Sequence, residues 1–220
     1  MILGHYGLAF ASKRLAPRTS LGTLTFAAQW LDELWPVLLL LGFEHVRPAP
    51  GLMAANSLDF SYYPYSHSLL MAIVWSLSIG VAYYLVRRDR TGALTIGALV
   101  VSHWLLDLPM HRPDLPLAPG PSVKVGLGAW NSIALTVLLE LGLLGIGLAS
   151  YLRRTKSRNR IGSWTLWVGV VLLLAVFASG FAGPPPADEK TIGLGALGLW
   201  IFVPLFAWAD RNRTVSQQAQ

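Results

Sequence analysis

The sequence predicts an all-α protein that crosses a membrane as a polytopic helical bundle of about six transmembrane helices. Composition is the first observation: 54% of the 220 residues are hydrophobic and 13% are charged, whereas a soluble domain carries about 25% charged residues. The second is that apolar runs of about 20 residues, enough to cross about 30 Å of hydrocarbon, alternate with short basic clusters. We therefore expect a single transmembrane domain over residues 1–213 and a disordered cytoplasmic tail over residues 214–220.

Six apolar runs define the expected spans. In chain order they cover residues 22–42, 68–86, 91–109, 128–150, 163–182 and 191–209. With these spans, thirteen Lys and Arg residues fall on one face of the membrane and four on the other. Because Lys and Arg are retained on the cytoplasmic side, the face with thirteen is expected to be cytoplasmic. Both termini then lie in the cytoplasm, and the location expected is a bacterial inner membrane.

The segment before the first span carries His5, and its placement has two solutions. The simplest topology leaves His5 in the cytosol, ahead of Lys13. However, Ile2 to Ala11 is apolar enough to fold back as a half-helix. Eight residues of helix above Lys13 would lift His5 by about 12 Å, to about the depth of Asp32.

The sequence contains no cysteine, which excludes disulfides, thiolate metal sites and a cysteine nucleophile. Any metal ion must therefore be held by His, Asp or Glu. The net charge of +6 arises from short basic clusters between apolar runs. This pattern is typical of membrane topology signals and not of a nucleic-acid footprint, so no nucleic-acid partner is expected.

Acidic and imidazole side chains lie inside the expected spans, where a charge near the bilayer centre costs about 2.5–3.5 kcal/mol. Asp32 and Glu33 fall near the middle of the first span, about 100° apart around the helix, so the two cannot face one cavity equally. His103 and Asp107 are four residues apart in the third span and share one helical face. Each of these groups needs a partner.

Structural and functional interpretations compete at these positions. The His103–Asp107 pair fits either an intramembrane hydrogen bond between helices or two ligands of one ion. His67, at the outer mouth of the second span, fits either a ligand or a hydrogen-bonding group at the rim. Asp32 is favoured as a functional acid, and Glu140, near the middle of the fourth span, as a structural or proton-handling acid.

The end of the third span carries an expectation about its neighbouring loop. Pro109 is expected to end the helix before His111. His111 then belongs to a proline-rich outer loop over residues 110–127, which is expected to form an ordered lid.

Two patterns of small residues are interpreted as structural. Ser66 and Ser68 flank His67, but neighbours in sequence at a helix start are expected to point apart, so this proximity indicates no nucleophilic triad. Gly142, Gly145 and Ala149 are interpreted as a close-packing helix face.

Four segments together resemble a known family. They are Gly4-His5, Asp32-Glu33, Tyr65-Ser66-His67-Ser68-Leu69 and His103-Trp104-Leu105-Leu106-Asp107. They resemble the membrane-bound, metal-dependent hydrolase family typified by an inner-membrane protein associated with the SOS regulon. That family is distantly similar to zinc-dependent phospholipase C and the single-strand nuclease fold. Residues 63–70 and 102–116 are more similar still to an uncharacterised group of bacterial multi-pass proteins labelled hydrolase-like or permease-like.

The resemblance covers residues 1–130 and implies a ligand set for a divalent ion, with zinc expected. The implied ligands are His5, Asp32, His67, His103 and Asp107. The sequence departs from the family at two points. Asp32-Glu33-Leu34-Trp35 stands where the family often has Asp-x-Asp-His, and Tyr62 or Tyr63 stands where the first His of His-Arg-Gly-x-Thr-His is expected.

Three functions follow as hypotheses. In the first, a metal-dependent hydrolase uses Asp32, His103 and Asp107 as catalytic residues, with His67 and His5 completing the ion site. It would cleave an ester or phosphoester in a small-molecule or lipid substrate that arrives from the surrounding membrane lipids. The second is a proton- or cation-coupled transporter that uses Asp32, Glu140 and His103, and the third is a non-catalytic membrane scaffold. The sequence leaves the oligomeric state open.

Overall fold

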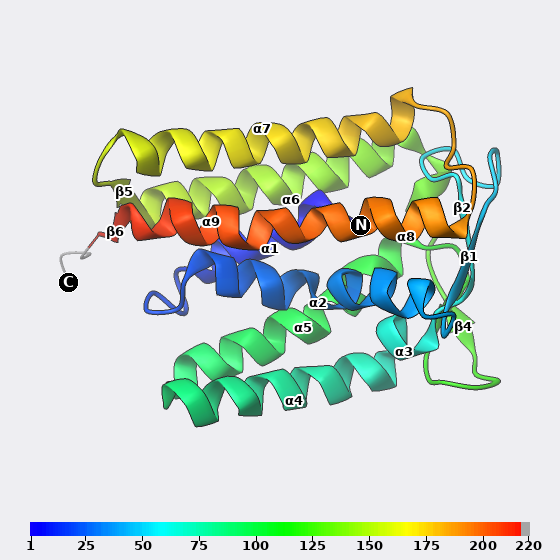
Figure 1. The fold of residues 1–220 in the computed structure, drawn as a ribbon, viewed down its shortest axis with the longest axis horizontal. Coiled ribbons are helices and arrows are strands. Elements are labelled where there is room, and N and C mark those ends of the chain that lie inside the picture. The colour runs from blue at the N-terminus through cyan, green and yellow to red at the C-terminus, as the bar shows by residue number, and fades with distance from the viewer. Residues whose placement is uncertain (217–220) are drawn as a thin grey trace.

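The computed structural model describes residues 1–216 and confirms the all-α helical bundle, with most helices running along the long axis of the molecule (Figure 1). The α-helices are α1 (Leu3–Ser12), α2 (Leu21–Leu40), α3 (Pro64–His67), α4 (Leu69–Arg87), α5 (Arg90–Met110), α6 (Ile133–Arg154), α7 (Arg160–Ala182), α8 (Glu189–Leu197) and α9 (Phe202–Arg211). Two 3₁₀ turns, η1 (Ala129–Asn131) and η2 (Gly198–Ile201), precede α6 and join α8 to α9.

Five helical segments between residues 1 and 216 are long and apolar enough to cross a membrane. They are α4, α5, α6, α7 and the continuous helical stretch Glu189–Arg211, which comprises α8, η2 and α9. The chain is therefore a membrane protein by the length and composition of its helices.

The first predicted span forms α2, a 20-residue helix. It carries Gln29, Asp32 and Glu33, which make it more polar than the other long helices. α2 lies at the centre of the bundle, against α1, α5, α8 and α9. Because its neighbours are protein helices rather than lipid, α2 can carry the polar residues of a site.

The folded-back half-helix is confirmed as α1, which packs inside the bundle against α6, α2 and α5. Its first turns place His5 and Met1 in the interior. The expectation that the N-terminal residue lies at the basic face is therefore wrong for this chain.

Close approach of α1 and α6 depends on one pair of glycines. A Cβ added to Gly7 or to Gly147 would overlap the backbone of the opposite helix. By contrast, a Cβ added to Gly142 or Gly145 would meet no atom of the described chain within 4 Å. The predicted close-packing face was therefore wrong, because these two glycines point away from the neighbouring helix and Gly147 makes the contact.

Three short antiparallel strand pairs cap the two ends of the bundle (Figure 1). β1 (His45–Pro48) pairs with β2 (Leu58–Tyr62) and β3 (Leu115–Pro116) with β4 (Lys124–Val125) at one end, whereas β5 (Thr155–Ser157) pairs with β6 (Arg213–Val215) at the other. The predicted disordered tail is therefore wrong for Thr214 and Val215, which pair with β5, while residues 217–220 of that prediction lie outside the described residues.

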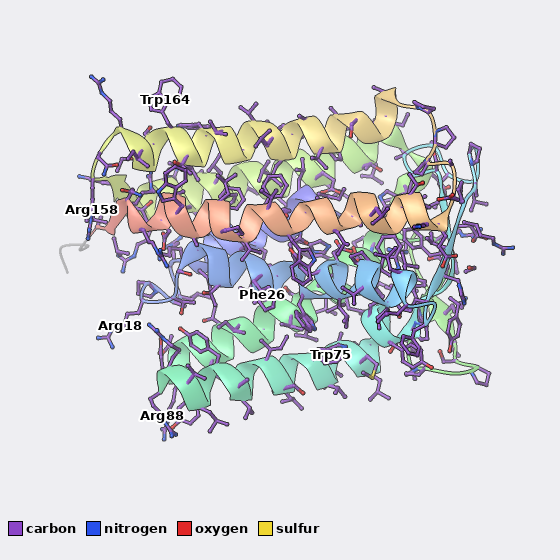
Figure 2. The ribbon with its side chains drawn as sticks, viewed as in Figure 1. Arg18, Phe26, Trp75, Arg88, Arg158 and Trp164 are labelled. Atoms are coloured by element: carbon purple, nitrogen blue, oxygen red, sulfur yellow. The ribbon has the colours of Figure 1, made fainter. Side chains whose placement is uncertain are left out.

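Basic side chains gather at the end that carries β5 and β6. Figure 2 shows Arg18, Arg88 and Arg158 at this end of the bundle. Lys13 lies here too, where its Nζ donates to Asp210 at 2.6 Å. The charge asymmetry expected from the spans is therefore present in the folded chain.

Two apolar clusters hold the helices around α2. One joins α2 to α5 and includes Leu24, Leu31 and Val100, and the other joins α1 to α7 and α9 and includes Phe10 and Phe206. Packing against α5 thus fixes α2, and packing against α7 and α9 fixes α1. This packing positions the side chains described next.

Candidate functional site

All five predicted ligand residues meet inside the bundle. His5 comes from α1, Asp32 from α2, His67 from the C-terminal end of α3, and His103 and Asp107 from adjacent turns of α5. Four of the side chains are buried, and that of Asp32 is 21% exposed. Segments separated by up to about a hundred residues thus converge on one point.

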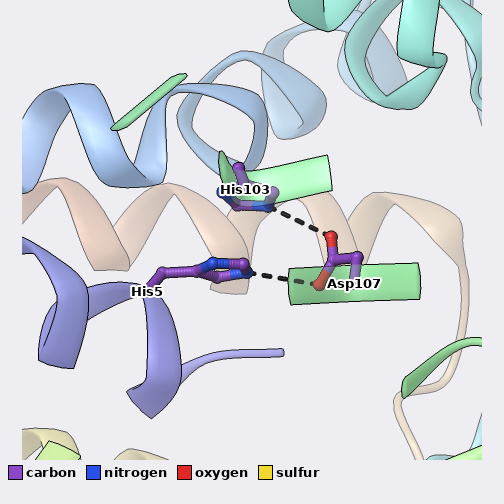
Figure 3. Close-up of side chains that lie close together, drawn as sticks. All are labelled: His5, His103 and Asp107. Carbon is purple, nitrogen blue, oxygen red and sulfur yellow. Dashed lines mark hydrogen bonds and ion pairs between the residues drawn. The ribbon is translucent and has the colours of Figure 1, made fainter. Parts of the chain in front are cut away.

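The Asp107 carboxylate bridges two histidines (Figure 3). His5 Nε2 lies 3.2 Å from Oδ1, and His103 Nε2 lies 3.3 Å from Oδ2. The two imidazole rings stack with centroids 3.6 Å apart and planes 13° apart. The backbone amine nitrogen of Met1 also contacts Oδ1.

The Asp32 carboxylate completes a second group that shares His103. His67 Nε2 lies 3.3 Å from Asp32 Oδ1, and His103 Nε2 lies 3.6 Å from Asp32 Oδ2. The site therefore contains two overlapping triads, each with donor atoms within 4.8 Å of one another: His5, His103 and Asp107, and Asp32, His67 and His103.

These separations fit donor atoms arranged around an ion. Two ligand atoms about 2.1 Å from one ion, at a tetrahedral angle, lie about 3.4 Å apart. The four nitrogen–oxygen pairs given above span 3.2 to 3.6 Å.

A hydrogen bond to the backbone fixes the tautomer of His103, and so decides that the nitrogen facing the cluster carries a lone pair. His103 Nδ1 lies 2.8 Å from the carbonyl oxygen of Ala28. A carbonyl only accepts, so Nδ1 carries the proton and, in the neutral ring, Nε2 carries the lone pair. His103 Nε2 is buried and has no hydrogen-bond partner within residues 1–216. Such an orphaned, lone-pair-bearing nitrogen is the feature that a metal ligand requires.

His67 is oriented in the same sense through a relay. Glu44 accepts from the Ser66 hydroxyl at 2.6 Å, and Ser66 Oγ lies 2.7 Å from His67 Nδ1. Because the Ser66 proton points to Glu44, its oxygen accepts from Nδ1–H, and His67 Nε2 keeps its lone pair. Glu44 also accepts from the backbone N–H groups of Tyr65 and Ser66, at 2.7 and 2.8 Å.

Sequence reasoning missed this relay. The expectation that Ser66 and His67 point apart was wrong, because at the end of the short helix α3 Ser66 Oγ lies within hydrogen-bond distance of His67 Nδ1. Adjacency was therefore a usable signal for Ser66. Glu44 is 22 residues from Ser66, and nothing in its local sequence marks it. Burial raises the pKa of the Glu44 carboxyl, and the hydrogen bonds from Ser66 and Tyr65 oppose that rise.

Local sequence explains how these residues are held. Pro64 begins α3, and Ser68 caps α4 by accepting from the Met71 N–H, so His67 sits at a rigid junction between two helices. On α2, Pro36 lacks the N–H that would pair with the carbonyl of Asp32. The predicted acids of α2 do diverge: Asp32 faces the histidines, while the carboxylate of Glu33 is buried without a hydrogen-bond partner among the described residues.

Glu140 serves as an anchor for α1. Its two carboxylate oxygens accept from the backbone N–H groups of Ile2 and Gly4, each at 2.9 Å. A carboxylate there satisfies otherwise unpaired N–H groups and complements the positive end of the helix dipole. Of the two interpretations given for Glu140, this geometry supports the structural one.

His111 belongs to a separate network at the outer rim. The prediction that the helix ends before His111 is confirmed, since α5 ends at Met110, one residue beyond Pro109, and His111 is its C-cap. His111 Nδ1 lies 2.9 Å from Asp114 and 3.2 Å from the Tyr63 hydroxyl. Burial lowers the pKa of His111. For Asp114, burial raises the pKa, but hydrogen bonds and charge from His111 and Arg112 outweigh it and lower the pKa overall.

A cavity of about 430 Å³ adjoins the cluster. Asp32, His67 and Asp107 line it, whereas His5 and His103 are not among its wall residues. The remaining wall is mostly apolar and includes segments of α7, α8 and η2. The cavity thus has a mostly apolar wall and a few polar groups at one end, which is the usual construction of a small-molecule site.

Comparison with known proteins does not assign a family. No family model matches the chain, and no solved structure matches it. A stretch of 86 residues is 38% identical to part of the DNA translocase FtsK of Corynebacterium glutamicum, covering 38% of this chain and 8% of the translocase. The fold and the site therefore define the chain only as a helical membrane protein with a buried His–Asp cluster.

Proposed function

We propose that this chain is a membrane-embedded, metal-dependent hydrolase that cleaves an ester or phosphoester. The observation that carries the proposal is the convergence of three imidazoles and two carboxylates, with the Nδ1 atoms of His67 and His103 committed to acceptors. Their Nε2 lone pairs then point at a common volume. This is how proteins prepare histidines as metal ligands.

Zinc is the ion that suits the donors best. Neutral imidazoles with carboxylates are the ligand sets of catalytic zinc sites, which use three protein ligands and leave one position open. One lone pair binds one ion, and the two triads share the Nε2 of His103, so the site suits a single ion. Such an ion would polarise the scissile oxygen and acidify a water molecule.

The side chains divide the remaining work. His103 and Asp107 would bind the ion, and both are buried where α1, α2 and α5 meet. Asp32, the most exposed of the five, lines the cavity and is positioned to accept a proton from an attacking water. The water oxygen bonds to the carbonyl carbon or phosphorus, the bond to the leaving oxygen breaks, and the proton passes to the leaving alcohol.

Two observations favour the hydrolase over its rivals. A transporter that relays protons through Glu140 needs that carboxylate free, but both of its oxygens accept from the α1 backbone. A scaffold needs a hydrogen-bond partner for each buried polar group, but among residues 1–216 His103 Nε2 has none and lies instead between the carboxylates of Asp32 and Asp107.

The orientation proposed for the molecule follows from its charge. The end with Arg18, Arg88 and Arg158 (Figure 2) is assigned to the cytoplasm of a bacterial inner membrane. The end with β1–β4, and the cavity beside it, then face the outer half of the bilayer.

Metal content tests the proposal directly. Detergent-purified protein is loaded with zinc, desalted and assayed by elemental analysis together with hydrolysis of a panel of ester and phosphoester substrates. Wild-type protein is expected to retain zinc and hydrolyse at least one class, and His103→Ala to lose both. His45→Ala, which removes an exposed imidazole at the start of β1, is the control and should retain both. Folded wild-type protein that retains no divalent ion would end the proposal.

A further inference from the structure

The cavity beside the cluster extends as a cleft between α7 and the α8–η2 segment. Val176, Phe177 and Phe181 line it on the α7 side. Ile192 and Leu199 line it on the other. Its polar end is formed by residues of the His–Asp cluster, so one continuous space joins apolar helix surfaces to the site.

The cleft opens sideways on a lipid-facing surface. α7 packs along α9, and towards the C-terminal end of α7 the lining residues Val176 and Phe181 remain 36% and 38% exposed. On α8, Leu194 lies beside the cleft and is 55% exposed. Exposed apolar side chains on membrane-spanning helices face hydrocarbon, so the mouth of the cleft faces the bilayer interior.

The depth of the cleft matches the outer half of a bilayer. α8 begins at Glu189, and Leu199 follows ten residues later, about 15 Å further along the helix. About 30 Å of hydrocarbon separates the two faces of a membrane. The cleft therefore runs from the outer boundary to about the bilayer midplane, along the direction in which lipid tails lie.

Two glycines keep the cleft open. Gly180 on α7 and Gly195 on α8 both line it. A Cβ added to either would meet no described atom within 4 Å. Both helices thus expose bare backbone to the space between them.

We propose that this cleft binds an acyl chain of a membrane lipid, which enters sideways from the outer leaflet. The tail lies between α7 and the α8–η2 segment, and the ester or phosphoester at its head lies beside Asp32, His67 and Asp107. The assignment of the scissile bond rests on the proposed function, whereas binding of the tail does not.

The chemistry of the walls selects this occupant. The side chains named above along the α7 and α8–η2 walls are hydrocarbon or aromatic, so burial of methylene groups is the contact they offer. The mouth of the cleft faces the bilayer, which supplies acyl chains. The carboxylates and imidazoles at the polar end of the cleft suit the ester junction of a lipid. A wholly apolar helix of another protein would leave these polar groups buried without partners, which costs free energy.

The test fills the cleft from its own walls. Gly180→Trp and Gly195→Trp place an indole in the open space without a steric clash at Cβ. Gly142→Trp is the matched control, because an added Cβ there also meets no described atom within 4 Å and Gly142 lies outside the cavity wall. Each protein is reconstituted in phosphatidylglycerol vesicles that contain a lipid with a photoactivatable diazirine on its acyl chain.

Crosslinking and mass spectrometry then locate the lipid tail. Wild type and Gly142→Trp are expected to crosslink at residues 176–181 of α7 and residues 192–199 of the α8–η2 segment. Gly180→Trp and Gly195→Trp should lower that yield at least about tenfold, because the indole displaces several methylene groups. Zinc content should stay at the wild-type level in all four proteins. Tail crosslinks spread evenly over the lipid-facing helices, or a yield unaffected by both tryptophans, would overturn the proposal.

Hydrolysis separates this inference from the proposed function. Wild type is compared with the tryptophan variants on a water-soluble short-chain ester or phosphoester and on the long-chain lipid in vesicles. Loss of activity on the lipid alone supports the tail site. Equal activity on both substrates in every variant refutes the tail site while the hydrolase stands. Cleft-specific crosslinks in a wild type that hydrolyses nothing refute the hydrolase while the tail site stands.

Discussion

Substitution of Glu44 by Gln would test whether the relay behind His67 prepares it as a ligand. Glu44 Oε1 accepts from two backbone N–H groups, and Oε2 accepts from the Ser66 hydroxyl. A glutamine can keep its oxygen on the two N–H groups, but its amide nitrogen then donates to Ser66 Oγ. The Ser66 proton must turn toward His67 Nδ1, which moves the imidazole proton to Nε2 and removes the lone pair that faces the site.

The magnitude follows from the position of Glu44 behind the ligand. Loss of an outer-shell partner of a ligating histidine typically lowers metal affinity by about 10- to 100-fold, or about 1.4–2.7 kcal/mol at 25 °C. Glu44 is fully buried and accepts a short hydrogen bond of 2.6 Å from Ser66, so we expect a loss of zinc affinity in the upper part of this range. Zinc affinity is measured by competition with a chromophoric chelator in detergent at constant pH.

Asp210→Asn is the matched control for this experiment. Asp210 also accepts three hydrogen bonds, from Lys13, the Leu21 N–H and Tyr151, but it lies at the basic end of the bundle. Its loss is expected to lower thermal stability and leave zinc affinity unchanged. A Glu44→Gln protein that binds zinc as tightly as wild type would refute the tautomer argument, and so would an equal loss of affinity in Asp210→Asn.

Three further changes test the site, the helix packing and the rim. Asp32→Asn is expected to abolish hydrolysis and weaken zinc binding, whereas Glu33→Gln, about 100° further around α2, should preserve both. Elemental analysis with the substrate panel compares them. Gly147→Val is expected to lower the unfolding free energy by about 1–3 kcal/mol through overpacking, and to weaken zinc binding because it displaces the helix that carries His5. Gly145→Val, at a position where an added Cβ meets no described atom, should do neither. Thermal unfolding with and without zinc distinguishes the two variants. Burial lowers the pKa of His111 from 6.5, so below that pH the unfolded chain binds a proton that the folded chain excludes, and stability falls as the pH drops. The melting temperature of metal-free wild type should therefore decline more steeply between about pH 7 and pH 5 than that of His111→Gln, and identical slopes would contradict this.

The fold class was accessible from the sequence because hydropathy and basic clusters act locally. Each apolar run reports its own helix, and α4, α5, α6 and α7 lie close to the predicted spans. The shared face of His103 and Asp107 was equally accessible, since one helix fixes the relation between residues four apart. Resemblance added the three distant ligands His5, Asp32 and His67.

What the sequence could not determine depends on contacts between distant segments. The Gly7–Gly147 approach that seats α1, the Glu44–Ser66 relay behind His67, and the cleft between α7 and α8 each require helices from different parts of the chain to be placed in three dimensions. The sequence by itself determined a helical membrane bundle with ionisable groups in its spans. Only the tertiary structure decided that these groups share one volume, because periodicity reports the face of a helix and packing alone decides which face it meets.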